Sequence, residues 1–119
     1  MFMQVLSPAT TLWDQQTLFV IHGPGESLGA HIRKWSPLTD EGWTLVFPRW
    51  ETPAELREHL EECRRKRGLD PERIVIAGVA EGASYALELA AETGRPCVSV
   101  SGEEPLAVIA SRARKSLYG

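Results

Sequence analysis

The residues best placed to do chemistry surround Ala80, which stands midway between glycines at positions 78 and 82. A wholly apolar run at 74–77 precedes them, and a helix of small residues is expected to follow to about position 92. A continuous apolar run is typical of a strand buried on both faces of a parallel sheet. Glycines on either side of the central residue permit a sharp strand-to-helix turn, because a Cβ would not fit there. This is the spacing of a nucleophile elbow, whose central side chain attacks an acyl group, but here that side chain is a methyl group.

Three segments of the chain, in order, resemble one known family. The run DPERIVIAGVAEGA at 70–83 resembles the D-P-x-R-I-x-x-x-G-x-S-x-G-G entry to the nucleophile in the carboxylesterase/phospholipase and dienelactone-hydrolase branch of the α/β-hydrolases. Upstream, LFVIHG at 18–23 resembles that family's apolar strand ending in His-Gly, and downstream CVSVSG at 97–102 resembles its next strand. The resemblance covers roughly residues 17–105 and implies an α/β fold, a three-layer sandwich around a mostly parallel sheet.

The resemblance also implies a catalytic triad in the chain order Ser, Asp, His. It places the nucleophile at Ala80, and it places the acid and the base after later strands. This chain ends one helix after the strand that contains Val98, and its three histidines, His22, His31 and His59, all precede the elbow. A methyl group cannot attack a carbonyl. The sequence therefore predicts a catalytically inactive domain with a binding, regulatory or structural role.

A second interpretation is a small carboxylesterase-like serine hydrolase whose nucleophile has been replaced by mutation. Such a replacement would not supply the missing acid and base. Ser84, on the helix after the elbow, is expected to be a packing residue rather than a displaced nucleophile.

The resemblance further implies an oxyanion hole formed by two backbone N–H groups. One is the N–H of Glu81, at a helix N-terminus. The other donor would be the N–H of the residue that follows the His-Gly pair. In this chain that residue is Pro24, and proline has no N–H. Removing one such donor costs about 10²–10³-fold in rate. The candidate binding region for a small carboxylate or ester is thus a vestigial oxyanion region of six residues: His22, Gly23, Pro24, Gly25, Glu81 and Gly82.

The three histidines also have structural interpretations. In the resembling family the histidine before this glycine supports the loop through hydrogen bonds, and we expect the same of His22. His31 and His59 fall within predicted helices and are expected at the surface.

A Rossmann-like nucleotide-binding domain is the third interpretation. Gly23, Gly25 and Gly29 form a loose G-x-G-x-x-x-G loop between a strand and a helix. The strict dinucleotide fingerprint needs G-x-G-x-x-G and an acidic residue at the end of the next strand. Here that strand ends in Phe-Pro-Arg, where Arg49 could face a phosphate.

The 119 residues suffice for a single domain, 1–119, with one core. A full α/β-hydrolase is about twice as long, so the resemblance implies a minimal or half version. The net charge is −3, and acidic and basic residues are interspersed along the chain, which argues against nucleic-acid binding. No stretch resembles a signal peptide or a membrane span, which predicts a cytoplasmic location. No motif indicates a cofactor or a metal, and Cys63 and Cys97 are expected to be reduced core residues.

Strands and helices that alternate along the chain are expected to position the elbow. Strands are expected at 2–6, 18–21, 43–47, 74–77 and 97–100, with a short one at 11–13, and helices at 28–35, 53–67, 83–92 and 106–117. Pro48 is expected to end the third of the longer strands, and Thr52 and Glu55 form a capping box before the second helix. The helix after the elbow is apolar on most sides, which predicts a central, buried position.

The last strand and the last helix predict an assembly. Residues 97–100 are uncharged and β-prone, and an exposed strand edge invites pairing. We expect a homodimer, formed by pairing of these strands or by packing of the C-terminal helices through Leu106, Ile109, Ala113 and Leu117. The alternative is a monomer in which the last helix folds back and covers the edge.

Overall fold

In the described residues, five strands form one sheet in the order β1-β3-β2-β4-β5. The computed structural model describes residues 2–7, 16–23, 28–67, 71–100 and 105–118. The strands are β1 (Phe2–Leu6), β2 (Gln16–Ile21), β3 (Trp43–Arg49), β4 (Ile74–Val79) and β5 (Cys97–Val100). β1 runs antiparallel to β3, whereas the other neighbouring pairs are parallel. This confirms the mostly parallel sheet predicted from the sequence.

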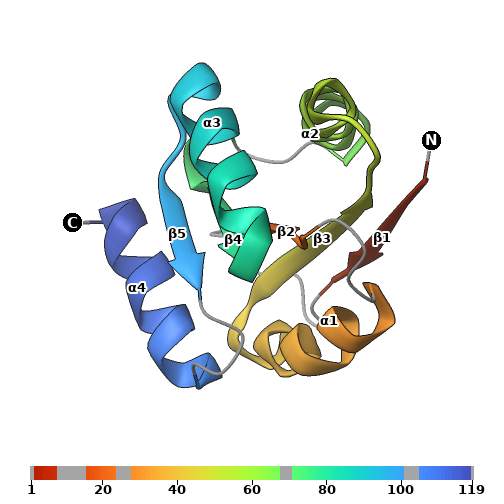
Figure 1. Cartoon of the computed structure of the whole chain (residues 1–119). Coiled ribbons are helices and arrows are strands. Elements are labelled where there is room, and N and C mark those ends of the chain that lie inside the picture. Colours follow the sequence, from red (N-terminus) through yellow and green to blue (C-terminus); the bar gives the residue numbers. More distant parts are fainter. Residues whose placement is uncertain (1, 8–15, 24–27, 68–70, 101–104, 119) are drawn as a thin grey trace.

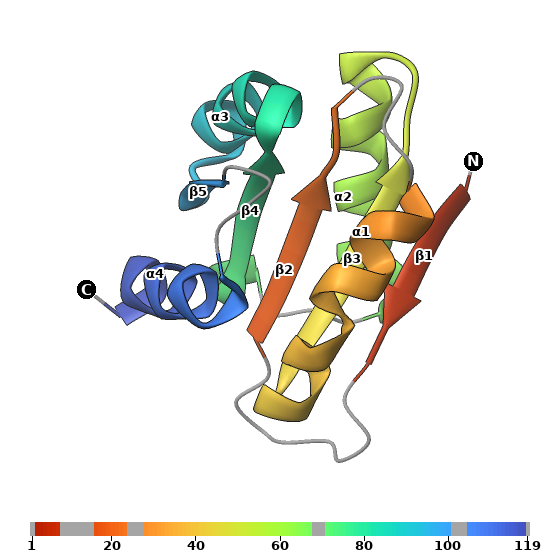
Figure 2. The ribbon, with the colours of Figure 1, turned by 60° about the horizontal axis from the view of Figure 1, so that its bottom comes forward.

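Helices cover both faces of the sheet, which makes the predicted three-layer sandwich (Figure 1). Helices α1 (Leu28–Trp35) and α4 (Leu106–Tyr118) lie over one face. Helices α2 (Pro53–Arg67) and α3 (Ala83–Thr93) lie over the other. Figure 2 shows the same arrangement from a second direction, with α1 in front of β3 and α4 at the lower left beside β4. Their bounds agree with the sequence expectations to within a residue or two.

The central strand β2 shows why helices must pack on both faces of the sheet. Leu18 and Val20 pack in the core under α1 and α4, whereas Phe19 and Ile21 pack in the core under α2 and α3. All four side chains are fully buried. Successive side chains of a strand point to opposite faces, so a strand in the middle of a covered sheet must be apolar at every position. The same holds for β4, which carries the elbow at its end.

Helix α2 begins with the residues that the sequence singled out. The Glu55 carboxylate accepts hydrogen bonds from the Thr52 hydroxyl and from the backbone N–H of Glu51, each at 3.3 Å. The Glu55 N–H donates to the Thr52 carbonyl at 3.0 Å. In a standard capping box the glutamate accepts from the N–H of the N-cap residue, here Thr52. Glu55 instead accepts from the N–H of the preceding residue, Glu51, and so still satisfies a backbone donor next to the helix start.

One sequence expectation about the strands is wrong, and another is not tested. Strand β3 does not end before Pro48 but runs through it to Arg49. The pairing of β3 with β2 extends only to Val46, and Pro48 pairs with antiparallel β1, so the missing N–H removes no bond from the β2 ladder. The short strand expected at 11–13 lies outside the described residues.

Helix α3 is also less buried than its composition predicted. Leu87 is 56% exposed, and Ser84 and Glu88 are exposed as well. Ala86, Leu89 and Ala90 form the face that packs on the sheet. Because α3 is an outer layer over β4 and β5, one face meets the core and the other faces solvent.

Helix α4 uses its apolar stripe inside the chain. Ile109 and Ala113 are completely buried in the core that includes Val98 and Val100 of β5. These two residues are therefore not free for the helix-to-helix contact expected from the sequence, because α4 covers the face of β4 and β5 in its own chain. The homodimer itself stays a prediction.

Replacing Ile109 tests where the α4 stripe is buried. We expect Ile109→Ala to lower the free energy of unfolding by about 2–4 kcal/mol, because it leaves a cavity in the core. The neighbouring Val108 is 47% exposed, so Val108→Ala should cost less than about 0.5 kcal/mol. Urea unfolding followed by tryptophan fluorescence measures both. Equal effects of the two variants would contradict the packing of α4.

Candidate functional site

The elbow, residues 78–82, makes the sharp turn that the glycine spacing predicted. Val79 is still extended, with φ −106° and ψ 125°, and Ala80 then turns to φ 51°. Ala80 is the one non-glycine residue with positive φ in the described part of the chain. A left-handed conformation costs an L-residue about 1–2 kcal/mol. The turn is a short 3-10 segment, Ala80–Gly82, and α3 begins at once after it.

Close contacts with neighbouring atoms explain why glycine is needed at positions 78 and 82. A Cβ on Gly78 would lie 2.6 Å from both the Cα of Ala83 and the Cβ of Ala86, so glycine lets α3 fold back against β4. A Cβ on Gly82 would lie 2.3 Å from the carbonyl oxygen of Ile21. Glycine at this position therefore lets the elbow rest directly on the end of β2.

His22 follows Ile21 and thus lies beside the elbow. It is 7% exposed, and its Nδ1 donates to the Gly23 carbonyl at 2.9 Å. Its own carbonyl accepts a hydrogen bond from Trp50 Nε1 at 3.3 Å. Among the described residues, its buried Nε2 has no hydrogen-bond partner. His22 is therefore held by hydrogen bonds on its ring and on its backbone, as the resemblance implied.

An aromatic cluster holds this end of the sheet together. The rings of His22 and His31 stack with centroids 6.2 Å apart, and the ring of Trp50 is tilted against His22 with centroids also 6.2 Å apart. The Tyr85 ring of α3 meets Trp50 at 4.7 Å. The cluster joins the ends of β2 and β3 to α1 and α3. Sequence reasoning missed Trp50, although a tryptophan just after a buried strand, at the edge of the sheet where α/β folds bind ligands, was a usable signal.

The surface positions expected for two histidines are wrong. His31 is 9% exposed because its ring stacks in the aromatic cluster. His59 is completely buried, and its Nε2 lies 3.0 Å from the carbonyl oxygen of Arg49 at the end of β3. Both histidines lie on the inner faces of their helices, where a ring nitrogen can satisfy backbone or neighbouring groups.

The structure brings together part of the predicted binding region. His22, Gly23 and Gly82 meet at the end of β2, and Glu81 is exposed beside them. Pro24 and Gly25 lie outside the described residues, so the second oxyanion donor has no described counterpart. The glycine loop of the nucleotide interpretation falls partly in the same segment. At position 80 the side chain is a methyl group on an exposed residue.

The described residues hold no group of three or more His, Cys, Asp or Glu side chains that could bind a metal ion. In the same residues, no helix combines the length and the apolar character needed to cross a bilayer.

Solved structures share this arrangement of strands and helices. A poly(3-hydroxybutyrate) depolymerase, LpqC, from Bordetella parapertussis matches 82% of this chain at a TM-score of 0.65 and 16% identity, over 44% of its own length. A bacterial heroin esterase matches 83% of this chain at 0.62 and 19% identity, over 38% of its length. Proline iminopeptidase from Mycobacterium smegmatis matches 82% at 0.57 and 22% identity, over 38% of its length.

These similarities define the fold. The chain has the α/β-hydrolase fold, and it spans about two fifths of the length of those three structures. No protein-family model and no curated protein sequence matches it. At identities of this size the similarity carries no activity over to this chain.

Adding a methyl group at Gly82 tests the contact between the elbow and β2. Gly82→Ala should lower the free energy of unfolding by about 3 kcal/mol, because its Cβ would meet backbone atoms that cannot move aside. Gly94→Ala is the matched control. Gly94 has φ 70° but no atom within 4 Å of an added Cβ, so only conformational strain of about 1 kcal/mol is expected. Urea unfolding compares them, and a smaller loss for Gly82→Ala would contradict the contact.

Removing the methyl group of Ala80 tests the strain in the elbow. Relief of the positive φ gains about 1–2 kcal/mol, and the greater freedom of glycine in the unfolded chain takes back about 0.4–1 kcal/mol. We expect Ala80→Gly to be slightly stabilising. Ala83→Gly, at a residue with φ −61° in α3, should instead cost about 0.5–1 kcal/mol. Thermal melts compare the stability of the two variants with that of the wild type, and equal destabilisation by both would show that Ala80 is unstrained.

Proposed function

We propose that this hydrolase-like domain does not perform serine-type hydrolysis and acts as a binding domain, with a small carboxylate or ester as the ligand of its elbow region. The observation that carries the proposal is the exposed Ala80 at φ 51°, in the position from which the fold presents its nucleophile. The turn is complete in its backbone, but its side chain can neither attack a carbonyl nor exchange a proton.

The backbone of the elbow supports a binding role. The first turn of a helix leaves N–H groups without intrahelical partners, and these favour a carboxylate or a polarised carbonyl oxygen. The N–H groups of Glu81 and Gly82 lie in this first turn, whereas the N–H of Ala83 already donates to the Ala80 carbonyl. The exposed carboxylate of Glu81 opposes an anion there, so we expect weak binding, with a neutral ester less affected than a carboxylate.

The surroundings of His22 support the absence of catalysis. A general base must reach the nucleophile by hydrogen bond and be oriented by a third group. The Nε2 of His22 is buried, and its ring lies in the aromatic cluster with the ring centroids of His31 and Trp50 each 6.2 Å away, whereas residue 80 is exposed. His31 and His59 are buried in packing roles of their own. A hydroxyl placed at position 80 would therefore lack an oriented base.

The variant Ala80→Ser tests the proposal directly. It should fold as the wild type does and hydrolyse p-nitrophenyl acetate and butyrate no more than a few-fold faster, because its hydroxyl is not activated. It should also resist labelling by a fluorophosphonate. Turnover raised 100-fold or more, with stoichiometric labelling, would overturn the proposal in favour of an esterase whose nucleophile has been replaced.

A cysteine at the same position supplies the control for access. Ala80→Cys should be alkylated rapidly by iodoacetamide, since residue 80 is exposed. Peptide mapping separates this thiol from Cys63, which is buried, and from Cys97, which is partly buried. Rapid alkylation together with an inactive serine variant would locate the defect in the missing base. A blocked cysteine would instead mean that the elbow is closed, and would count against the binding role.

A further inference from the structure

We propose that Trp50 is a positioning residue of the elbow: it sets the direction in which the N–H groups of Glu81 and Gly82 point. It acts through two neighbours, His22 and Tyr85. The inference rests on the binding role proposed above, because these N–H groups are the donors of that site. It adds the residue that controls the geometry of the site and that lies on a distant part of the chain.

The His22 carbonyl joins Trp50 to the elbow. It accepts a hydrogen bond from Trp50 Nε1 at 3.3 Å. The same carbonyl meets Gly82, where a Cβ would lie 2.8 Å from the carbonyl carbon and 3.0 Å from the oxygen. A single carbonyl group, buried with the rest of His22, therefore separates the indole from the elbow. A movement of this peptide plane moves the surface on which the elbow rests.

Trp50 also contacts the helix that follows the elbow. The rings of Trp50 and Tyr85 are tilted by 58° with centroids 4.7 Å apart, a favourable arrangement for an aromatic pair. Tyr85 lies in the first turn of α3, which begins directly after Gly82. The same indole thus touches both the end of β2, on which the elbow rests, and the helix that leaves the elbow.

The core holds Trp50 itself in place. Its side chain is 8% exposed and belongs to the core under α2 and α3. The carbonyl of the preceding Arg49 accepts a hydrogen bond from Nε2 of His59 at 3.0 Å, and His59 is completely buried. The backbone next to Trp50 is therefore anchored to α2, so the indole is a fixed support for the elbow.

The direction of the elbow N–H groups decides whether they can bind one oxygen together. A hydrogen bond weakens steeply when its angle at the hydrogen falls below about 120°. On the helix side the turn is closed by the Ala83 N–H, which donates to the Ala80 carbonyl. On the strand side the turn meets the His22 carbonyl, which Trp50 holds. Loss of the indole N–H would therefore change the direction of the elbow relative to β2.

Two other tryptophans provide matched controls. Trp35 and Trp43 are completely buried in the core under α1 and α4, on the opposite face of the sheet. Among the described residues, neither indole N–H has a hydrogen-bond partner. The substitution Trp43→Phe removes the same atoms as Trp50→Phe, but it breaks no hydrogen bond and touches no part of the elbow. An effect on the elbow that only Trp50→Phe produces is therefore not a general effect of a smaller core side chain.

A thiol at position 80 reports the direction of the N–H groups without any ligand. N–H groups at a helix start favour the thiolate and lower the thiol pKa. In the Ala80→Cys background, we expect Trp50→Phe to raise the midpoint of the pH profile of iodoacetamide alkylation by at least about 0.3 pH unit, a two-fold loss of thiolate. Trp43→Phe should leave this midpoint unchanged, although it also lowers the melting temperature. No upward shift with Trp50→Phe, or an equal shift with both variants, would overturn the proposal.

Variants of Tyr85 keep the proposal testable if Trp50→Phe does not fold. Tyr85 is only partly buried, so its replacement disturbs the core less. In the same Ala80→Cys background, Tyr85→Leu removes the ring that contacts Trp50 and should shift the alkylation profile upward. Tyr85→Phe keeps that ring and should restore the original profile. Equal profiles for these two variants would then overturn the proposal.

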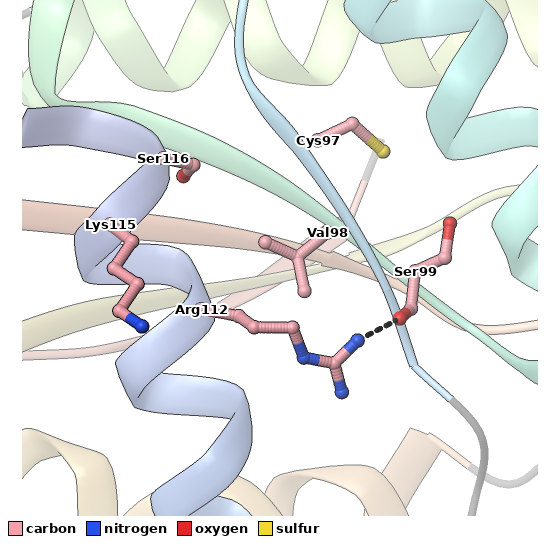
Figure 3. A pocket seen from close by; sticks show the side chains of 6 residues that line it. All are labelled: Cys97, Val98, Ser99, Arg112, Lys115 and Ser116. Atoms are coloured by element: carbon pink, nitrogen blue, oxygen red, sulfur yellow. Dashed lines mark hydrogen bonds between the residues drawn. The ribbon is translucent and has the colours of Figure 1, made fainter. Parts of the chain in front are cut away.

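Ligand binding separates this proposal from the function on which it rests. A groove of about 510 Å³ between β5 and α4 has Arg112 and Lys115 in its lining, and it offers a carboxylate a second place to bind (Figure 3). The probe is therefore the neutral ester methyl butyrate, followed by the NMR shifts of the Glu81 and Gly82 amides. Absence of these shifts in the wild type would contradict the binding role of the elbow, and the alkylation profile would still decide the role of Trp50.

The same titration tests the positioning role where the ester binds. We expect Trp50→Phe to weaken binding of methyl butyrate at least about three-fold, because the donors are no longer pre-organised. Trp43→Phe should bind the ester as the wild type does. Equal affinities of Trp50→Phe and the wild type would overturn the positioning role and leave the binding role in place.

Discussion

The contact between Gly82 and the end of β2 is the constraint on which the rest of the structure depends. Where a Cβ would stand, the carbonyl oxygen of Ile21 lies at 2.3 Å, so the elbow and the neighbouring strand touch backbone to backbone. This contact sets the direction in which α3 leaves the sheet, and Gly78 lets that helix lie close against β4. Ala80 is carried into a positive φ as a consequence. A strained residue persists only where its surroundings determine its conformation, and here the two glycines and the buried strand do so.

The elbow has the backbone geometry that presents a nucleophile but lacks the nucleophilic side chain. The backbone turn needs glycines, a buried strand and a helix, and all of these are present. Nucleophilic catalysis needs particular side chains on top of that turn, and position 80 holds a methyl group. The likeness to an esterase, a depolymerase and a peptidase therefore describes how the chain is folded, since a fold supports many functions. The aromatic cluster around His22 fills the adjoining space and fixes the ends of β2 and β3.

The binding role proposed for the elbow depends on its backbone, because the N–H groups of a first helical turn favour a small polar group. The elbow is also joined to its neighbours in the described sheet, since Gly78 of β4 pairs with Ser99 of β5.

The sequence by itself determined the order of the elements and the position of the turn. Apolar runs mark β2, β4 and β5, proline and the Thr52–Glu55 pair mark the start of α2, and the two glycines mark the elbow, because these signals act through neighbouring residues along the chain. Tertiary structure decided what each helix packs against and how much of it is buried. His59 is completely buried and Leu87 is 56% exposed, contrary to what the sequence of each helix predicts by itself. The reason is that burial depends on which strand a helix packs against, and Arg49, Val98 and the Ile21 carbonyl reach their partners from distant positions in the sequence.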